Sequence, residues 1–540
     1  MATPTSYTNK SVLILDDMPE MRSSLRSQVG SLGFENITLS SNVKEALDRF
    51  ATNNFDIILC DYYLAGGTDG QQFLEYLRNR KIIGRGALFV MITAEQGYDH
   101  VVTAAECLPD DYLLKPFTAE LLKVRLERLL DKKQRLARVD QLQNRNNWNG
   151  VITECDEIIN AKDRYLVDVM RIKGNALLFS GRTQEAVEFY QQMNATRPMP
   201  WAKLGLARAF QKNGDLAASQ NTLSDLIQES PRLMAAYDLL SQIHLATGDA
   251  DAAMAILDSA RTISPNSLAR HRAIANVAEG KGDFARVEQA LDPVIKKTRN
   301  SPLRETDDFA RLGNALTEIG QLEKAIALME DARETFKNDA HDPLLAAVEA
   351  IAQHKAGNFA KAENALARAL QSDVGKLSTK VSMRIAQACL TTGQHENAQN
   401  ILKRIVQSNP ESKSLHAQVS KVLRDNGAAE LADKLVADSI REIIQLNNEA
   451  VHRAKAGEYN VAAQMLTDAA HRLPGNMQIV ANASAAILLD VLNNGVDSDK
   501  LRKAQGFQQT VLAEMPTHPK LGEITELINR IRAKYTPSKP

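Results

Sequence analysis

The chain has few cysteines and no long apolar segment. Its 540 residues contain four cysteines, which lie far apart at Cys60, Cys107, Cys155 and Cys389. This spacing excludes a disulfide framework and a site of closely paired thiolate ligands, so we expect reduced, buried cysteines. The first ten residues are polar, and no run of about eighteen apolar residues occurs, which argues against a membrane span. We therefore expect a cytoplasmic protein.

A strong net charge is also absent. The chain has 65 basic and 66 acidic side chains and a formal net charge of −1. Such a balance produces no overall field, which excludes charge-driven binding to nucleic acid or to an anionic membrane surface. Phosphate-binding loops, nucleophile elbows and zinc-protease motifs are missing, and the ten histidines show no ligand spacing. Outside the first 117 residues we therefore expect no catalytic centre.

The first 117 residues alternate between short apolar runs and amphipathic stretches of helical length. The apolar runs lie at residues 12–15, 37–39, 57–60, 88–92 and 112–114. This alternation is typical of βα units around a parallel sheet. We predict a doubly wound α/β domain with five parallel strands.

The rest of the chain is helical and repeats itself. Glycines recur at intervals of 30 to 38 residues, and a small residue lies seven positions before each of them. Two antiparallel helices pack closely only where side chains are small, so this period predicts a series of helical hairpins. The spacing resembles the tetratricopeptide repeat, which implies an all-α superhelical solenoid that binds proteins. The turn glycines are Gly181, Gly214, Gly248, Gly282, Gly320, Gly357, Gly393, Gly427 and Gly457.

These patterns divide the chain into four segments. Residues 1–117 form the core of the first domain, and residues 147–516 form an array of about ten repeats. Residues 517–540 form a capping helix and tail. Residues 118–146 contain neither glycine nor proline and carry leucines at helical spacing, so we predict one connecting helix that extends the last helix of the first domain. This helix would join the two parts rigidly.

Polar side chains follow the predicted strands of the first domain. Asp16 and Asp17 follow the first strand, Asp61 the third, Thr93 the fourth and Lys115 the fifth. The carboxyl ends of parallel strands meet at one edge of a sheet. Three carboxylates at one edge repel one another unless a cation lies between them, and hard oxygen ligands suit Mg²⁺. Asp61 would then act as a nucleophile toward a phosphoryl group, with Lys115 and Thr93 contacting the phosphate oxygens.

This pattern resembles the receiver domain of bacterial response regulators, a flavodoxin-like fold, over about residues 11–125. The resemblance implies that Asp61 accepts phosphate from a histidine kinase or phosphotransfer protein. It also implies that Thr93 and Tyr112 form a switch. Mg²⁺ would be held by Asp16, Asp17, Asp61 and the backbone carbonyl of Tyr63. The residues that carry the resemblance are Leu15-Asp16-Asp17, Asp61, Thr93-Ala94 and Lys115-Pro116-Phe117.

The loop after Asp61 departs from the family pattern. Most receivers have a Met-Pro pair after the phosphoacceptor and a glycine eight positions beyond it. Here Leu64 and Ala65 follow, and Gly70 lies nine positions beyond Asp61. We expect a loop at residues 65–70 that is one residue longer and more flexible.

The repeat array is expected to bind an unidentified protein or peptide in its concave groove. We predict a two-component response regulator whose output is protein binding, without an enzymatic output module, and with a homodimer as a further expectation. The alternative is a phosphorylation-independent scaffold or inhibitor whose receiver serves for docking or dimerisation. The predicted groove residues are Arg171, Asn175, Arg208, Gln242, Arg272, Asn276 and Asn314.

Overall fold

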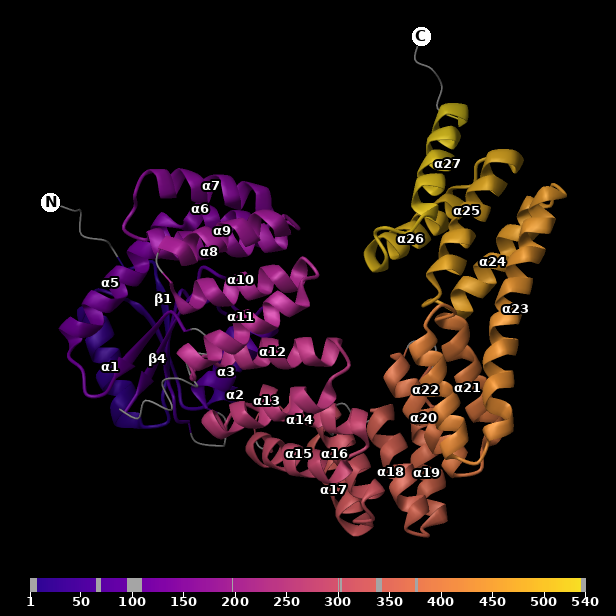
Figure 1. Cartoon of the computed structure of the whole chain (residues 1–540), viewed down its shortest axis with the longest axis horizontal. Helices are drawn as coiled ribbons and strands as arrows, with labels where there is room; N and C mark the ends of the chain where they lie inside the picture. Colours follow the sequence, from indigo (N-terminus) through magenta and orange to yellow (C-terminus); the bar gives the residue numbers. More distant parts are fainter. Residues whose placement is uncertain are drawn as a thin grey trace. The chain divides into compact units, whose positions relative to one another are not determined.

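The structure is a computed structural model of the chain (Figure 1). It describes residues 7–64, 69–94, 109–196, 198–299, 301, 304–336, 342–373 and 377–535. Most of the loop predicted to be long, residues 65–68, and the predicted buried Cys107 lie outside these ranges. The chain forms two compact units, Met1–Ala315 and Leu316–Pro540. The predicted receiver and the first repeats therefore belong to one unit.

The first unit begins with a parallel sheet. Its five strands have the order β2-β1-β3-β4-β5, and every pairing is parallel. All residues of β3 and β4 are buried, because helices cover both faces and leave no room for alternation. The prediction of a five-stranded, doubly wound sheet is confirmed. The strands are β1 (Ser11–Leu15), β2 (Asn36–Ser40), β3 (Ile57–Asp61), β4 (Leu88–Thr93) and β5 (Asp111–Leu114).

Two apolar cores lie on opposite faces of this sheet. One contains Phe73, Leu74 and Phe89 and packs α2 (Val43–Phe50) and α3 (Gly70–Asn79). The other packs α1 (Pro19–Ser31) and α5 (Ala119–Arg135) through the residues Leu25, Val29, Leu122 and Leu126. Alternate residues of β1, β3, β4 and β5 enter the two cores, as the period of two requires.

The prediction of one connecting helix at 118–146 is wrong. The segment forms two helices, α5 and α6 (Ala137–Asn144), separated at Leu136, which has φ −95° and ψ 7°. Leu136 and Val139 are buried in an apolar core shared with α7 (Trp148–Asn160). The helix is thus interrupted at Leu136 although the segment contains neither glycine nor proline.

The predicted hairpins are present in the first unit. All nine predicted turn glycines of the chain have positive φ, between 73° and 87°, a region that L side chains rarely adopt. The chain returns at each of them into the next antiparallel helix. The helices are α8 (Leu166–Phe179), α9 (Thr183–Thr196), α10 (Pro200–Lys212), α11 (Leu216–Glu229), α12 (Met234–Ala246), α13 (Ala250–Ile263), α14 (Leu268–Lys281), α15 (Phe284–Thr298) and α16 (Thr306–Glu318), whose end falls in the second unit.

The second unit continues the hairpins with one departure. The predicted repeats around Gly427 and Gly457 do not have separate helices between these glycines, because α23 runs unbroken through that interval. The interval is the shortest in the array and contains neither glycine nor proline, so nothing ends the helix. The helices are α17 (Leu322–Thr335), α18 (Pro343–Lys355), α19 (Phe359–Leu370), α20 (Thr379–Thr391), α21 (His395–Ser408), α22 (Lys413–Asp425), α23 (Ala429–Lys455), α24 (Tyr459–Arg472), α25 (Met477–Asn494), α26 (Ser498–Glu514) and α27 (Lys520–Tyr535).

The helix α27 closes the array. Its buried residues Ile524, Leu527 and Ile531 join the core formed by α24, α25 and α26, while most of its other side chains are exposed. A helix with one buried apolar face and a mostly polar exposed face has the character of a terminal helix of a repeat array. Within the ranges that the structure describes, no helix combines the length and apolar character needed to cross a membrane.

Candidate functional site

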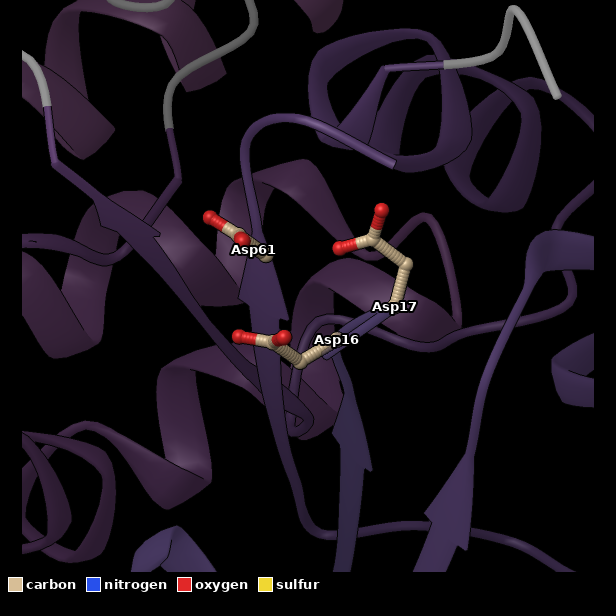
Figure 2. Close-up of side chains that lie close together, drawn as sticks. All are labelled: Asp16, Asp17 and Asp61. Carbon is tan, nitrogen blue, oxygen red and sulfur yellow. The ribbon is translucent and has the colours of Figure 1, made fainter. Parts of the chain in front are cut away.

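Three carboxylates meet at the carboxyl edge of the sheet. One oxygen each from Asp16, Asp17 and Asp61 lies within 4.8 Å of the others, and Figure 2 shows the three side chains clustered beyond the strand ends. Register explains the proximity: Leu15 of β1 pairs with Cys60 of β3, so the residue that follows each of them emerges at the same level. Asp16 is fully buried and Asp61 is 7% exposed.

Lys115 bridges two of these carboxylates. Its Nζ donates to Asp16 Oδ2 at 2.9 Å and to Asp61 Oδ2 at 3.0 Å. Its backbone N–H donates to the carbonyl of Thr93 at 2.7 Å, which holds the lysine beside the end of β4. The sequence analysis placed these residues at one edge, and the structure brings their side chains into contact.

The site carries an excess of negative charge. Burial raises the pKa of Asp61 above its usual value; Lys115 opposes this shift and the neighbouring Asp16 adds to it. Burial acts to lower the pKa of Lys115, but hydrogen bonds and charge from Asp16 and Asp61 raise it overall. Three carboxylates thus lie beside one ammonium, and the Arg22 guanidinium contacts the backbone carbonyl of Asp16 and not a carboxylate. An all-oxygen donor set with surplus negative charge fits a hard divalent cation such as Mg²⁺.

The two predicted switch residues lie on neighbouring strands. Thr93 is buried at the end of β4. Tyr112 pairs with Met91 across the β4–β5 ladder, and its partly buried ring packs against the core that contains Phe89. The side chain of Tyr63 is 45% exposed, so the role predicted for this residue depends on its backbone alone.

Gly70 has a packing role that the sequence did not reveal. The predicted flexibility concerned the loop at residues 65–70, most of which lies outside the described residues, whereas Gly70 itself is the first residue of α3 and packs tightly. A Cβ at this position would lie 2.4 Å from the carbonyl oxygen of Asp61 and 2.8 Å from Sδ of Met91. The Gly70 N–H also donates to the carbonyl of Tyr62 at 2.8 Å. Glycine is therefore needed here for the close approach of α3 to the phosphoacceptor strand.

Known protein families and proteins are similar in sequence to parts of this chain. The response regulator receiver domain profile matches residues 12–127, and tetratricopeptide repeat profiles match residues 204–267 and 353–421. The chemotaxis protein CheY of Pseudomonas aeruginosa is 31% identical over 121 residues, which cover 22% of this chain and 96% of that protein. The chain belongs to the response regulator receiver family.

Two further relatives match the same region of this response regulator. CheY-3 of Vibrio cholerae is 29% identical over 124 residues, covering 23% of the response regulator and 94% of CheY-3. The receiver domain of the Francisella response regulator 1452 is 27% identical, with a TM-score of 0.21, covering 23% of this chain and 98% of that domain. The receiver is thus followed by a tetratricopeptide repeat region that these relatives do not match.

The receiver of this response regulator is bonded to its first repeat helix. Lys132 and Arg135, near the end of α5, form ion pairs with Asp168 of α8 and with Asp163 in the segment before α8. We call the contacts between residues 128–135 and 163–168 the α5–α8 junction. Its contacts are Lys132 to Asp168 at 2.5 Å, Arg135 to Asp163 at 2.8 Å, Tyr165 Oη to Asp131 at 2.8 Å and to the Arg128 carbonyl at 3.1 Å, and Arg164 to Asp131.

The predicted groove residues of the response regulator lie on the first helix of successive hairpins. Asn314 is buried, and Arg272 is half-buried with three hydrogen bonds to Asp308 at 2.6 to 3.0 Å. The guanidinium of Arg171 lies over the ring of Trp201 at 5.5 Å. Asn175 is half-buried, whereas exposed side chains remain at Arg171, Arg208, Gln242 and Asn276. Groove binding by these residues stays a prediction.

Replacing Lys115 by Met should destabilise the receiver most at neutral and higher pH. A carboxyl group whose pKa is higher in the folded than in the unfolded state makes the folded state less stable as the pH rises between those two pKa values. Removing Lys115 raises the pKa of Asp61 further and therefore enlarges this loss of stability. Breaking such a buried ion pair costs about 3–5 kcal/mol without Mg²⁺ where Asp61 is ionised, and the cost should shrink as the pH falls and Asp61 becomes protonated. Hydrogen exchange of the β3 amides in denaturant measures this change in the free energy of unfolding. Lys44→Met, at an exposed position on α2, is the matched control, and a pH-independent loss would contradict the expectation.

Proposed function

We propose that this protein is a two-component response regulator that is phosphorylated on Asp61 by a histidine kinase or phosphotransfer protein. The observation that carries the proposal is the Lys115 bridge between Asp16 and Asp61 beside an all-oxygen cluster. Its output is protein binding through the repeats. We propose no other enzymatic activity and a cytoplasmic location.

The chemistry follows from the positions of these side chains. An Asp61 carboxylate oxygen attacks the phosphorus of a phosphohistidine; the new O–P bond forms as the P–N bond breaks, and the imidazole nitrogen keeps the electron pair and gains a proton. Lys115 is placed to neutralise a phosphoryl oxygen, and Thr93 to donate a hydrogen bond to another. Asp16, Asp17 and Asp61 would hold Mg²⁺, which supplies charge neutralisation for the transferred group.

The α5–α8 junction supports transmission of this event to the repeats. Asp111, next to Tyr112 on β5, accepts hydrogen bonds from Arg125 at 3.2 Å and from Arg128 at 3.0 Å on α5. The carbonyl of Arg128 in turn accepts a hydrogen bond from Tyr165, directly before α8. A shift of β5 can therefore reach the first repeat helix through a series of hydrogen bonds, and no flexible tether separates the receiver from that helix.

Incubating the full chain with Mg²⁺ and acetyl phosphate should add one phosphoryl group, measured by intact mass. Asp61→Asn should abolish the addition, because the amide is not a competent nucleophile. Asp48→Asn, which changes an aspartate on α2, should keep it. A chelator should lower uptake by roughly tenfold or more if the carboxylates hold the metal.

Two outcomes would contradict the proposal. Uptake that survives Asp61→Asn would show that another residue is modified. A wild-type chain that takes up no phosphoryl group from acetyl phosphate or from a kinase would favour the phosphorylation-independent scaffold.

A further inference from the structure

A cavity lies between three helices of the second unit. The helix α23 packs against both α21 and α24 (Figure 1), and the space that these helices enclose has a volume of about 330 Å³. Cavities of this size are large enough for small ligands or for side chains of a bound peptide. We call it the α21–α24 cavity. Its lining consists of Lys403, Arg404 and Gln407 of α21, Glu442, Ile443 and Leu446 of α23, Ala469 and Arg472 of α24, and Leu473 directly after α24.

The cavity depends on the unbroken helix α23. Five of the nine turn glycines are followed 17 residues later by a proline, and the second helix of each of these hairpins ends 15 residues after its glycine. The residue 17 positions after Gly427 is Ile444, so α23 continues. Ile443 and Leu446 therefore line the cavity from positions at which the other five hairpins have already left the helix.

The α21–α24 cavity is separate from the predicted partner groove. The predicted groove residues, from Arg171 to Asn314, lie on the first helices of hairpins in the first unit. The helices α21 and α24 are the second helices of hairpins in the second unit. The cavity is therefore a further candidate site on the repeats.

The polar part of the lining has an excess of positive charge. Lys403 and Gln407 both donate to the carboxylate of Glu442, at 2.7 Å and 2.9 Å. This carboxylate therefore already has a cationic partner. Arg404 and Arg472 add two further positive charges, so three basic side chains line the cavity with one acidic side chain.

The two arginines have no carboxylate partner. Arg404 is half-buried and makes neither a hydrogen bond nor an ion pair with any residue that the structure describes. Arg472 donates to the backbone carbonyl of Asp468 at 3.3 Å and forms no ion pair within the described part of the chain. Because a guanidinium presents a planar set of donors that matches a carboxylate, both arginines are suited to an anionic partner.

The rest of the lining is apolar. Ala469 and Leu473 are buried, whereas Ile443 and Leu446 are half-buried and pack against the core that α24 shares with α25, α26 and α27. Arg404 also lines an adjoining cavity of about 150 Å³, together with apolar residues that include Ile401, Ile405 and Pro474. A bound segment can therefore place an apolar side chain beside the arginines.

The turn after α24 holds the walls of the cavity together. The Nδ2 of Asn476 donates to the backbone carbonyl of Gln407 at 2.7 Å, which joins this turn to α21. The turn also lies against α21 at Gly475, where a Cβ would be 3.5 Å from the Cβ of Ser408. A site with fixed walls loses little conformational entropy when a ligand binds.

We propose that the α21–α24 cavity binds a peptide segment of a partner protein in which an acidic side chain lies beside an apolar one. The carboxylate pairs with Arg404 and Arg472, and the apolar side chain packs on Ile443, Leu446 and Leu473. The excess positive charge selects against basic segments. This inference rests on the proposed output, protein binding by the repeats, and gives that output a site outside the predicted groove.

Fluorescence anisotropy of labelled synthetic peptides, titrated with the full-length unphosphorylated chain, tests the site. The peptides carry a glutamate beside a leucine or a phenylalanine in a glycine-serine background. Two matched series replace the glutamate by lysine or the apolar residue by glycine. At least one acidic-apolar peptide should bind saturably, and its matched peptides should bind roughly tenfold more weakly.

Variants of the chain locate the binding. Arg404→Gln and Arg472→Gln, on opposite walls of the cavity, should each weaken binding of that peptide by roughly tenfold, because a charged partner of the carboxylate is lost. Arg530→Gln removes the same charge from an exposed position on α27 and should leave the affinity within about twofold of wild type. Unchanged hydrogen exchange in α25 shows that a variant remains folded, and the second arginine variant decides if the first unfolds.

Three outcomes would overturn the proposal. The first is a lack of saturable binding by every acidic-apolar peptide. The second is equal affinity for the wild type and for both arginine variants; the repeats would then bind the peptide elsewhere, and the proposed output would stand. The third is a change in the sedimentation of the chain in Arg404→Glu without any peptide binding, which would make a second copy the occupant. Phosphoryl uptake at Asp61 is measured separately, so its absence counts against the proposed function and not against this site.

Discussion

Gly70→Ala should destabilise the receiver by about 2–3 kcal/mol and strongly reduce phosphoryl uptake at Asp61. The added Cβ would lie 2.4 Å from the Asp61 carbonyl oxygen, 2.8 Å from Met91 Sδ and 3.0 Å from Cys60 Sγ. Because the nearest of these atoms is backbone, the clash moves α3 or the end of β3 rather than one side chain. Hydrogen exchange of β3 amides and phosphorylation by acetyl phosphate measure the two effects.

Gly30→Ala is the matched control in the same domain. Gly30 lies in α1, and a Cβ there would meet no heavy atom within 4 Å. Alanine should stabilise α1 by about 0.5–1 kcal/mol, because glycine is the poorer helix former. Equal effects of the two substitutions would mean that helix propensity, and not the contact with Asp61, governs Gly70.

Tyr190→Ala should destabilise the first repeats by about 3–5 kcal/mol, the cost of removing a large buried aromatic side chain. Tyr190 is 1% exposed, and its ring fills the space left by two glycines. A Cβ on Gly174 would lie 2.3 Å from the Tyr190 hydroxyl oxygen, and a Cβ on Gly205 would lie 2.3 Å from carbon atoms of the ring. The ring of Trp201, with its centroid 6.4 Å from that of Tyr190, makes tryptophan fluorescence during urea unfolding a direct measurement.

Leu245→Ala provides the control for this substitution. Leu245 lies on α12 in the same unit and is 42% exposed, so its truncation should change stability by less than about 0.5 kcal/mol. A loss for Tyr190→Ala no larger than that for Leu245→Ala would contradict the packing interpretation. Gly205→Ala should also destabilise, because the added methyl group and the Tyr190 ring compete for one space.

The sequence predicted the parts of the molecule that depend on local pattern. Strand ends brought Asp16, Asp61 and Lys115 together because parallel strands share an edge, and the register of β1 with β3 then fixed the contact. The turn glycines were predictable because a left-handed turn between two helices favours a residue without a side chain. These features can be predicted from the repeat period of the sequence and from the topology of a parallel sheet alone.

Features that depend on distant neighbours could not be predicted in the same way. Nothing in the local sequence marks the break at Leu136, a residue that packs into a core with side chains of later helices. Nothing near Gly205 in the sequence marks its role, which is to admit the Tyr190 ring. The acidic partners of Lys132 and Arg135 lie about 30 residues away in the sequence, so the helical pattern around these basic residues does not reveal their ion pairs.

The unbroken helix α23 has a consequence for how the second unit unfolds. Its 27 residues give a rod of roughly 40 Å, and the two hairpins that it joins share this rod. In an ordinary solenoid each hairpin can open at the loop to its neighbour. Here opening one hairpin requires bending or melting a helix that the other hairpin also uses. We therefore expect α22, α23 and α24 to exchange their amide hydrogens as a single cooperative block, larger than the usual two-helix step.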